Sequence, residues 1–180
     1  MGKYFLALVF SSYLVSIIQR MNIELLRPIV FLDLETTGLS LTQDRVVEIA
    51  MLKVSADGSR QMKRRLINPE KPIPAEVSAI HGITDEKVAN EPKFSEIAPE
   101  VSKILEGADL AGFNSTRFDI PLLAEEMLRA GINFDMEGKK AVDVQVIFHK
   151  KELILIVMLM NYLLNLKFML RVNLLEIILK

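Results

Sequence analysis

Cysteine is absent from this chain of 180 residues, which excludes a disulfide framework and any thiolate metal site. The absence fits a reducing compartment, and we therefore expect a cytoplasmic location. An excess charge of either sign is also lacking, since 22 lysines and arginines stand against 23 aspartates and glutamates. A protein that binds duplex nucleic acid along many phosphates is usually basic. Any nucleic-acid contact is therefore expected to be local, short or metal-mediated.

Apolar residues are concentrated at the two ends of the chain. Residues 1–20 contain an uncharged, mostly apolar run from Tyr4 to Ile18, which is shorter than the ~20 residues of a transmembrane helix. We interpret this extension either as an anchor or as translated sequence upstream of a true start at Met21. Residues 153–180 lack Gly, Pro, Asp, Ser and Thr, and their apolar pattern fits no single helical face. Our hypothesis is that this tail results from a frameshift near Glu152.

Between these ends, residues 27–150 alternate between strand and helix patterns, as is typical of an α/β domain. Apolar runs predict strands, and the turn chemistry of residues 56–59 predicts an antiparallel hairpin. Apolar residues at helical spacing predict amphipathic helices. The expected strands are Pro28–Asp33, Val46–Ser55, Met62–Ile67, Leu110–Phe113 and Ala141–Val144. The expected helices are a short one starting at Thr84, then Lys93–Leu105 and Phe118–Ala130, with Gly131 as the C-cap of the last.

The strongest chemical signal is a pair of carboxylates, Asp33 and Glu35, at the end of the first apolar run. Side chains two positions apart on a strand point to the same face. Two acids on one face repel each other unless a cation balances them, and hard oxygen ligands suit Mg²⁺ or Mn²⁺. The alternative is a strand that simply ends in an exposed acidic turn. The preceding buried run and the following Thr36, Thr37 and Gly38 favour a metal site.

A second signal is Asp119, which follows the expected strand Leu110–Phe113 at the start of a predicted helix. An acid in this position is often only a helix-capping residue. A strand neighbouring the first would instead bring Asp119 close to Asp33, and the two motifs would then form one site.

Together these segments resemble the DEDD superfamily of 3′→5′ exonucleases, and most closely the epsilon proofreading subunit of bacterial DNA polymerase III. The resemblance covers roughly residues 27–150 and several motifs in the right order. The matching segments are Asp33–Gly38, Val47–Ala50, His81–Thr84, Asn114 with Phe118 and Asp119, and the strand Ala141–Val144. The resemblance implies a ribonuclease H-like α/β fold, in which helices flank a mixed central sheet made of an antiparallel hairpin and parallel strands.

The resemblance also implies a mechanism that uses two divalent cations, Mg²⁺ or Mn²⁺. Asp33 would bridge the two metals, and Glu35 and Asp119 would complete part of the cage. The substrates implied are single-stranded or frayed DNA 3′ ends, and a DNA polymerase subunit is the implied partner. The residues expected to contact or orient the terminal nucleotide are Thr36, Thr37, Gly38, Asn114 and Phe118.

The third motif of the family, a general-base histidine followed five residues later by a fourth aspartate, has no match here. Ile154 stands five residues after His149, and His81 belongs to an earlier segment. Asp143 is the last aspartate of the chain, but it matches the strand before the third motif. A positioned base contributes about 10²- to 10⁴-fold to rate, so we expect the exonuclease activity of this chain to be impaired.

Three alternative functions stay open at the level of sequence. An RNA-trimming exonuclease relative would use the same first motif. A non-catalytic module that binds nucleic acid or a polymerase would retain the three acids without turnover. A membrane-tethered protein would use one or both apolar ends, although charged and polar residues interrupt the C-terminal run too often for a clean span. We expect no stable membrane partner.

Overall fold

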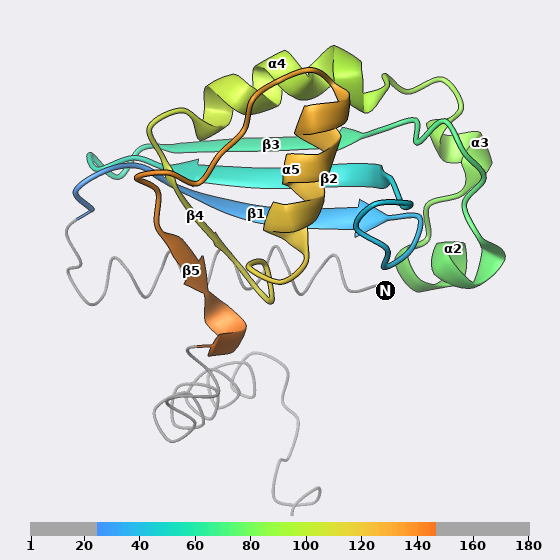
Figure 1. Ribbon diagram of the computed structural model, residues 1–180, viewed down its shortest axis with the longest axis horizontal. Helices are drawn as coiled ribbons and strands as arrows, with labels where there is room; N and C mark the ends of the chain where they lie inside the picture. Colours follow the sequence, from blue (N-terminus) through green and yellow to red (C-terminus); the bar gives the residue numbers. More distant parts are fainter. Residues whose placement is uncertain (1–24, 147–180) are drawn as a thin grey trace, which may run out of the picture. The chain divides into compact units, whose positions relative to one another are not determined.

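The computed structural model describes residues 25–146 of the chain (Figure 1). Contacts within the chain divide it into two units, Met1–Asp143 and Val144–Lys180. The predicted extension 1–20, the tail 153–180 and His149 lie outside the described residues, so the predicted domain boundaries stay predictions. Within residues 25–146, none of the helices combines the length and apolar character needed to cross a membrane.

The domain is built on one five-stranded sheet with the strand order β3-β2-β1-β4-β5. β1 pairs antiparallel with β2, and β2 pairs antiparallel with β3 across the predicted hairpin. β4 pairs parallel with β1, and β5 pairs parallel with β4. The predicted mixed sheet is therefore confirmed. The strands are β1 (Ile29–Thr36), β2 (Val46–Val54), β3 (Arg60–Leu66), β4 (Asp109–Gly112) and β5 (Ala141–Asp143).

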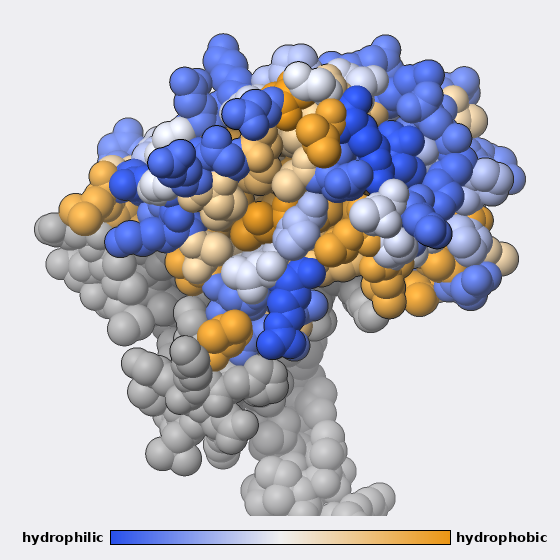
Figure 2. Space-filling view, viewed as in Figure 1, coloured by the Kyte–Doolittle hydropathy of each residue, from blue (hydrophilic) through white to orange (hydrophobic). Residues whose placement is uncertain are grey.

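Two amphipathic helices, α4 (Phe94–Leu105) and α5 (Asp119–Arg129), pack on the sheet; in Figure 1, α5 crosses in front of the strands and α4 runs along the top. Their apolar side chains share one core with Val30, Leu32 and Leu34 of β1, because alternate residues of a strand face the same side. Both helices were predicted from their apolar spacing. On the face shown in Figure 2, hydrophilic residues dominate the surface near α4, as expected of an outer helix with a polar side.

Helix α2 (Ala75–His81) was not predicted from the sequence, whereas the short α3 (Asp85–Val88) was expected from Thr84 onward. α2 has only seven residues, too few for an apolar stripe to show a helical period. Its start follows Pro74, which fixes a backbone angle that suits a helix start but is equally common in loops. A segment of this kind has no distinctive pattern in a single sequence.

β3 is an edge strand of the sheet, because β2 is its one neighbour in the strand order. Most of its side chains are exposed to solvent. Four of its seven residues are cationic: Arg60, Lys63, Arg64 and Arg65. Lys63 forms an ion pair with Glu100 of α4, and Arg64 forms one with Glu48 of β2.

Gly112, at the end of β4, provides a test of the packing between β4 and β1. A Cβ atom at this position would lie 2.6 Å from the Cβ of Ser115 and 2.8 Å from the carbonyl oxygen of Leu32. Both contacts are too short for a real side chain, and one of them is to backbone. We expect Gly112→Ala to lower the free energy of unfolding of the full chain by about 1 to 3 kcal/mol in urea titrations.

The matched control is Asn133→Ala, on an exposed segment, which should leave the urea midpoint almost unchanged. An equal midpoint for Gly112→Ala and the wild-type protein would show that β4 and β1 are not packed this closely.

Candidate active site

The two carboxylates of the first motif lie near the end of β1 and on the same face of the sheet. Asp33 stands opposite Ala50 of β2, and Glu35 stands opposite Glu48. The intervening Leu34 points to the core on the other side. The alternation of a strand therefore separates the acids from the core, as the sequence predicted.

Asp119 approaches β1 from the first turn of α5. The parallel ladder between β1 and β4 runs from Ile29 to Phe31. Beyond that ladder, the backbone N–H of Leu34 donates a hydrogen bond of 2.9 Å to Oδ1 of Asp119. Since Leu34 lies between Asp33 and Glu35, this bond brings the third acid to the first two. The predicted neighbourhood of Asp33 and Asp119 is thus present in the structure.

The electrostatics of these acids favour a bound cation. Burial raises the pKa of Asp119 to about 7, and the charges of Asp33 and Glu35 add to the rise. The Leu34 N–H opposes this rise without cancelling it. Burial also raises the pKa of Asp33 to about 6, with a further contribution from the charge of Glu48. Carboxylates that hold a negative charge this poorly gain from a divalent cation, which would remove the cost of ionising them.

The chemistry of the donor set fits Mg²⁺ or Mn²⁺, because all three motif acids offer hard oxygen atoms. Within residues 25–146, however, no three His, Asp or Glu side chains converge closely enough to form a ready metal cage. The described residues therefore provide the charge and the ligand type for a cation. They do not provide a closed coordination shell.

The turn Thr36-Thr37-Gly38 continues directly from β1. The Thr36 hydroxyl donates to the carbonyl oxygen of Gly38 at 2.6 Å. The Thr37 side chain is buried, and its hydroxyl donates to Oδ1 of Asp44 at 2.8 Å. Both threonine hydroxyls are thus used within the chain. The predicted nucleotide contacts at this turn would come from its backbone and its outer surface.

The second motif forms a tight turn before α5, and Asp143 supports it from β5. Asn114 adopts a left-handed conformation with φ 56°, and its N–H donates to Oδ1 of Asp143 at 3.0 Å. Thr116 donates to Oδ2 through its N–H at 3.1 Å and through its hydroxyl at 2.6 Å. Phe118 is partly buried against the core beneath α5. Both oxygens of Asp143 therefore bind this turn, and Asp143 is not a spare carboxylate.

His81 and Glu48 surround the site, and neither was predicted to have a role in it. The N–H of Ile83 donates to Nδ1 of His81 at 3.0 Å, so Nε2 carries the proton toward the carbonyl oxygen of Thr36, 3.2 Å away. Burial lowers the pKa of His81, which keeps the ring neutral. Glu48 is buried and pairs with Arg64. The antiparallel register of β1 and β2 places Glu48 beside Glu35, and such a register leaves no local signal in a single sequence.

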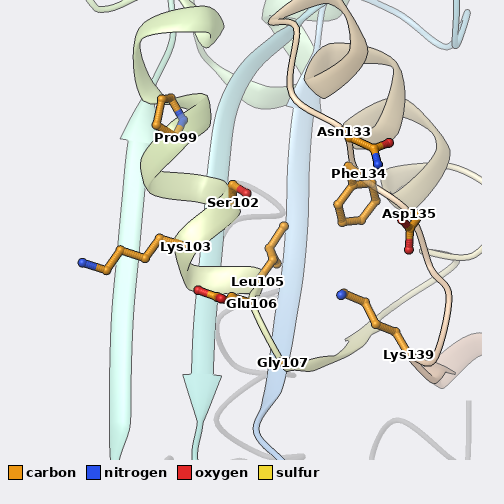
Figure 3. Close-up of a pocket in the computed structure, with 10 residues that line it drawn as sticks. All are labelled: Pro99, Ser102, Lys103, Leu105, Glu106, Gly107, Asn133, Phe134, Asp135 and Lys139. Carbon is orange, nitrogen blue, oxygen red and sulfur yellow. The ribbon is translucent and has the colours of Figure 1, made fainter.

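A separate cavity of about 420 Å³ lies between the end of α4 and the segment that follows α5 (Figure 3). Its lining includes Lys103 and Glu106 from the end of α4, together with Phe134 and Lys139. None of the residues predicted for the active site lines it. The cavity is therefore distinct from the carboxylate site.

Comparison of the fold with solved structures indicates the class of protein. Exonuclease I of E. coli, in a crystal structure with a dT13 oligonucleotide, aligns with this chain at a TM-score of 0.63 and 15% identity. The alignment covers 70% of this chain and 30% of Exonuclease I. At this identity the similarity establishes the fold alone, which is the expected ribonuclease H-like one.

The family follows from the sequence comparison. The RNase T family model, described as "Exonuclease", matches residues 30–177. The chain therefore belongs to this DEDD family of 3′→5′ exonucleases.

Among curated relatives, a DNA polymerase III subunit epsilon-like protein of Rhodobacter capsulatus is 40% identical over 59% of this chain and 15% of its own length. The DNA polymerase III subunit epsilon of Treponema pallidum is 37% identical over 53% of this chain and 44% of its own length. The chain thus spans less than half of these relatives.

The raised pKa values predict an unusual pH dependence of stability without metal. Both acids ionise near pH 4 in the unfolded chain but only near pH 6 to 7 in the folded chain. Their protonated forms therefore stabilise the fold fully below about pH 4, and this contribution is lost as the pH rises through 6 to 7. In EDTA, the free energy of unfolding of the wild-type protein should fall by about 2 to 4 kcal/mol from pH 5 to pH 8 relative to that of Asp119→Asn. The asparagine has no charge to bury, so this loss is absent in the variant.

Urea unfolding at the two pH values measures this difference. The control Asp135→Asn, on an exposed turn, should follow the wild-type protein at both values. The same change in unfolding free energy with pH in Asp119→Asn and in the wild-type protein would contradict the raised pKa of Asp119.

Proposed function

We propose that this chain is a 3′→5′ exonuclease domain of the DNA polymerase III epsilon type, which hydrolyses phosphodiester bonds at nucleic-acid 3′ ends. The observation that carries the proposal is the hydrogen bond from the Leu34 N–H to Asp119, which holds Asp119 next to the β1 segment that bears Asp33 and Glu35. Membership of the exonuclease family supports the reaction class.

In this proposal Asp33, Glu35 and Asp119 hold two divalent cations, Mg²⁺ or Mn²⁺. Such cations activate the attacking water and stabilise the charge of the leaving oxygen. The protein's own contribution is to orient the ligands: the Leu34 N–H fixes one oxygen of Asp119, and the alternation of β1 fixes Asp33 and Glu35. The turn at Thr36, with Thr37 and Gly38, would receive the terminal nucleotide.

The proposal includes slow turnover. His81 cannot serve as a general base from its observed position, because Ile83 and Thr36 occupy its two ring nitrogens. Burial also lowers the pKa of this ring, which makes it a weaker base. Asp143 is bound to the second-motif turn and is not available as a fourth ligand. Loss of a general base would reduce the rate by about 10²- to 10⁴-fold.

Single-stranded or frayed DNA 3′ ends are the proposed substrate. The near balance of charge in the chain fits a short contact at a strand end better than a long duplex interface. Exonuclease I, which shares the fold, was crystallised with a dT13 oligonucleotide. The names of the Rhodobacter and Treponema relatives suggest a DNA polymerase as the partner. RNA ends are the alternative substrate.

The test is release of nucleotides from a 3′-labelled single-stranded oligonucleotide by the purified full chain. We expect slow release that requires Mn²⁺ or Mg²⁺, is abolished by EDTA, and falls to background in Asp33→Ala because a proposed metal ligand is lost. The control Glu100→Gln alters an exposed ion pair of α4 and should keep the wild-type rate. Equal release by Asp33→Ala and the wild-type protein would assign the activity to a contaminant.

A second candidate is a non-catalytic module that binds nucleic acid, favoured by the engagement of both nitrogens of His81. It predicts metal-dependent binding of the same oligonucleotide, measured by fluorescence anisotropy, with no release of nucleotides over many hours. Binding that is lost in Asp33→Ala would support this module, whereas measurable release would exclude it.

A further inference from the structure

The loop formed by residues 37–45 is closed on itself around Asp44. Oδ1 of Asp44 accepts from the Thr37 hydroxyl at 2.8 Å, and Oδ2 accepts from the Ser40 N–H at 2.9 Å. A Cβ atom on Gly38 would lie 2.4 Å from Oδ2, so the absence of a side chain lets Asp44 close over the turn. Burial alone would raise the pKa of Asp44, but hydrogen bonds from Ser40, Thr37 and Lys71 outweigh it and lower that pKa. Asp44 is therefore held as a carboxylate in the centre of the loop.

Two arginines fasten this loop to α5. Arg45 binds the Glu126 carboxylate with two hydrogen bonds, from Nε at 2.7 Å and from a terminal nitrogen at 3.2 Å. Arg129 also binds Glu126, at 3.1 Å. The same guanidinium of Arg129 donates to the carbonyl oxygens of Thr42 at 2.6 Å and Asp44 at 3.1 Å. The loop is thus attached to α5 through both its side chains and its backbone.

The burial of Glu126 shows that this attachment is specific. The Glu126 side chain is fully shielded from solvent, while those of Arg45 and Arg129 are 22% and 25% exposed. A buried ion pair is seldom the most stable choice, because the desolvation of its charges offsets their attraction. Its advantage lies in geometry, since the fork of an arginine binds a carboxylate in a defined orientation. The cluster therefore sets the position of the loop more than it adds to stability.

α5 carries Glu126 and Arg129 of this cluster and the proposed metal ligand Asp119 on one rigid element. Glu126 lies about two helical turns after Asp119, or about 10 Å along the axis. Asp119 is bound to β1 at Leu34, and Glu126 is bound to the loop that leaves β1 after Thr36. α5 thus contacts both ends of the segment that runs from Leu34 in β1 to Arg45 at the end of the loop.

We propose that Glu126, Arg45 and Arg129 are positioning residues, which hold the Thr37–Gly38 turn at a fixed place relative to the carboxylates so that it can receive a nucleotide. The inference rests on the proposed function of the site, because the nucleotide is the ligand of that function. None of the three residues contacts the reacting atoms in this proposal. They act through the 37–45 loop.

The experiment uses the full chain and two variants, Glu126→Gln and Arg129→Gln. Arg129→Gln keeps the Arg45–Glu126 pair and removes the bonds to Thr42 and Asp44, so it tests the inference if Glu126→Gln fails to fold. Hydrogen exchange of the Thr37 and Arg45 amides, followed by NMR, reports on the loop. Titration with thymidine 5′-monophosphate and Mn²⁺ reports on nucleotide affinity by a route that needs no turnover.

We expect faster exchange of both loop amides in each variant, and nucleotide affinity about ten-fold weaker, the effect of losing one or two hydrogen bonds that fix the loop. The amides of Asn114 and Thr116, which Asp143 holds, should exchange at the wild-type rate and so show that the fold is intact. Arg129→Lys should restore part of the affinity, because a lysine keeps the charge and one donating nitrogen. Glu100→Gln is the matched control and should change neither quantity.

Unchanged exchange of the loop amides in both variants would overturn the inference. Faster exchange with unchanged nucleotide affinity would also overturn it, because the loop would then move without consequence for the ligand. If the wild-type protein binds no nucleotide, the proposed function fails on its own. The exchange rates then decide alone whether the cluster positions the loop.

Discussion

The cost of keeping acidic side chains away from water is the constraint on which the rest of this domain depends. Asp33 and Asp119 are brought together where the parallel ladder between β1 and β4 has ended, and the backbone N–H of Leu34, the residue after Asp33, binds Asp119. Burial raises the pKa of both. The strands and helices around them pack through apolar side chains, and this packing offsets the cost of burying the two acids. Negative charge is therefore costly at this site, and a bound cation would lower that cost.

The same region shows how few elements are needed to organise the site. β1 provides two acids and the following turn, α5 provides the third acid and the anchor of the loop, and β5 holds the second-motif turn through Asp143. Most of these contacts join a side chain to a backbone group or to an oppositely charged group, and the Thr116 hydroxyl adds a bond to Asp143. Orientation is therefore set by bonds with strong directional preference, and the apolar core supplies the rigid support beneath them.

Much of this arrangement could be predicted from the sequence because its signals are local. The amphipathic periods of α4 and α5 and the turn between β2 and β3 are visible in short windows, and the predicted elements match the observed ones closely. The proximity of Asp33 and Asp119 required the strand order, which the family resemblance supplied. The Arg45–Glu126 pair, the Asp143 support and the tautomer of His81 depend on contacts between distant segments. No periodicity encodes such contacts, and α2 was too short to show any.

The cationic edge strand β3 has a consequence for self-association. An exposed edge offers unpaired backbone groups to the edge of another molecule, and two identical edges can join as a continuous sheet. If two copies of β3 met antiparallel with full overlap, Lys63 of one copy would lie opposite Lys63 of the other, with the arginines of both strands close by. Like charges directly opposite each other are unfavourable in a sheet. A chain with almost no net charge thus carries, at this edge of its sheet, a local charge pattern that disfavours pairing with itself.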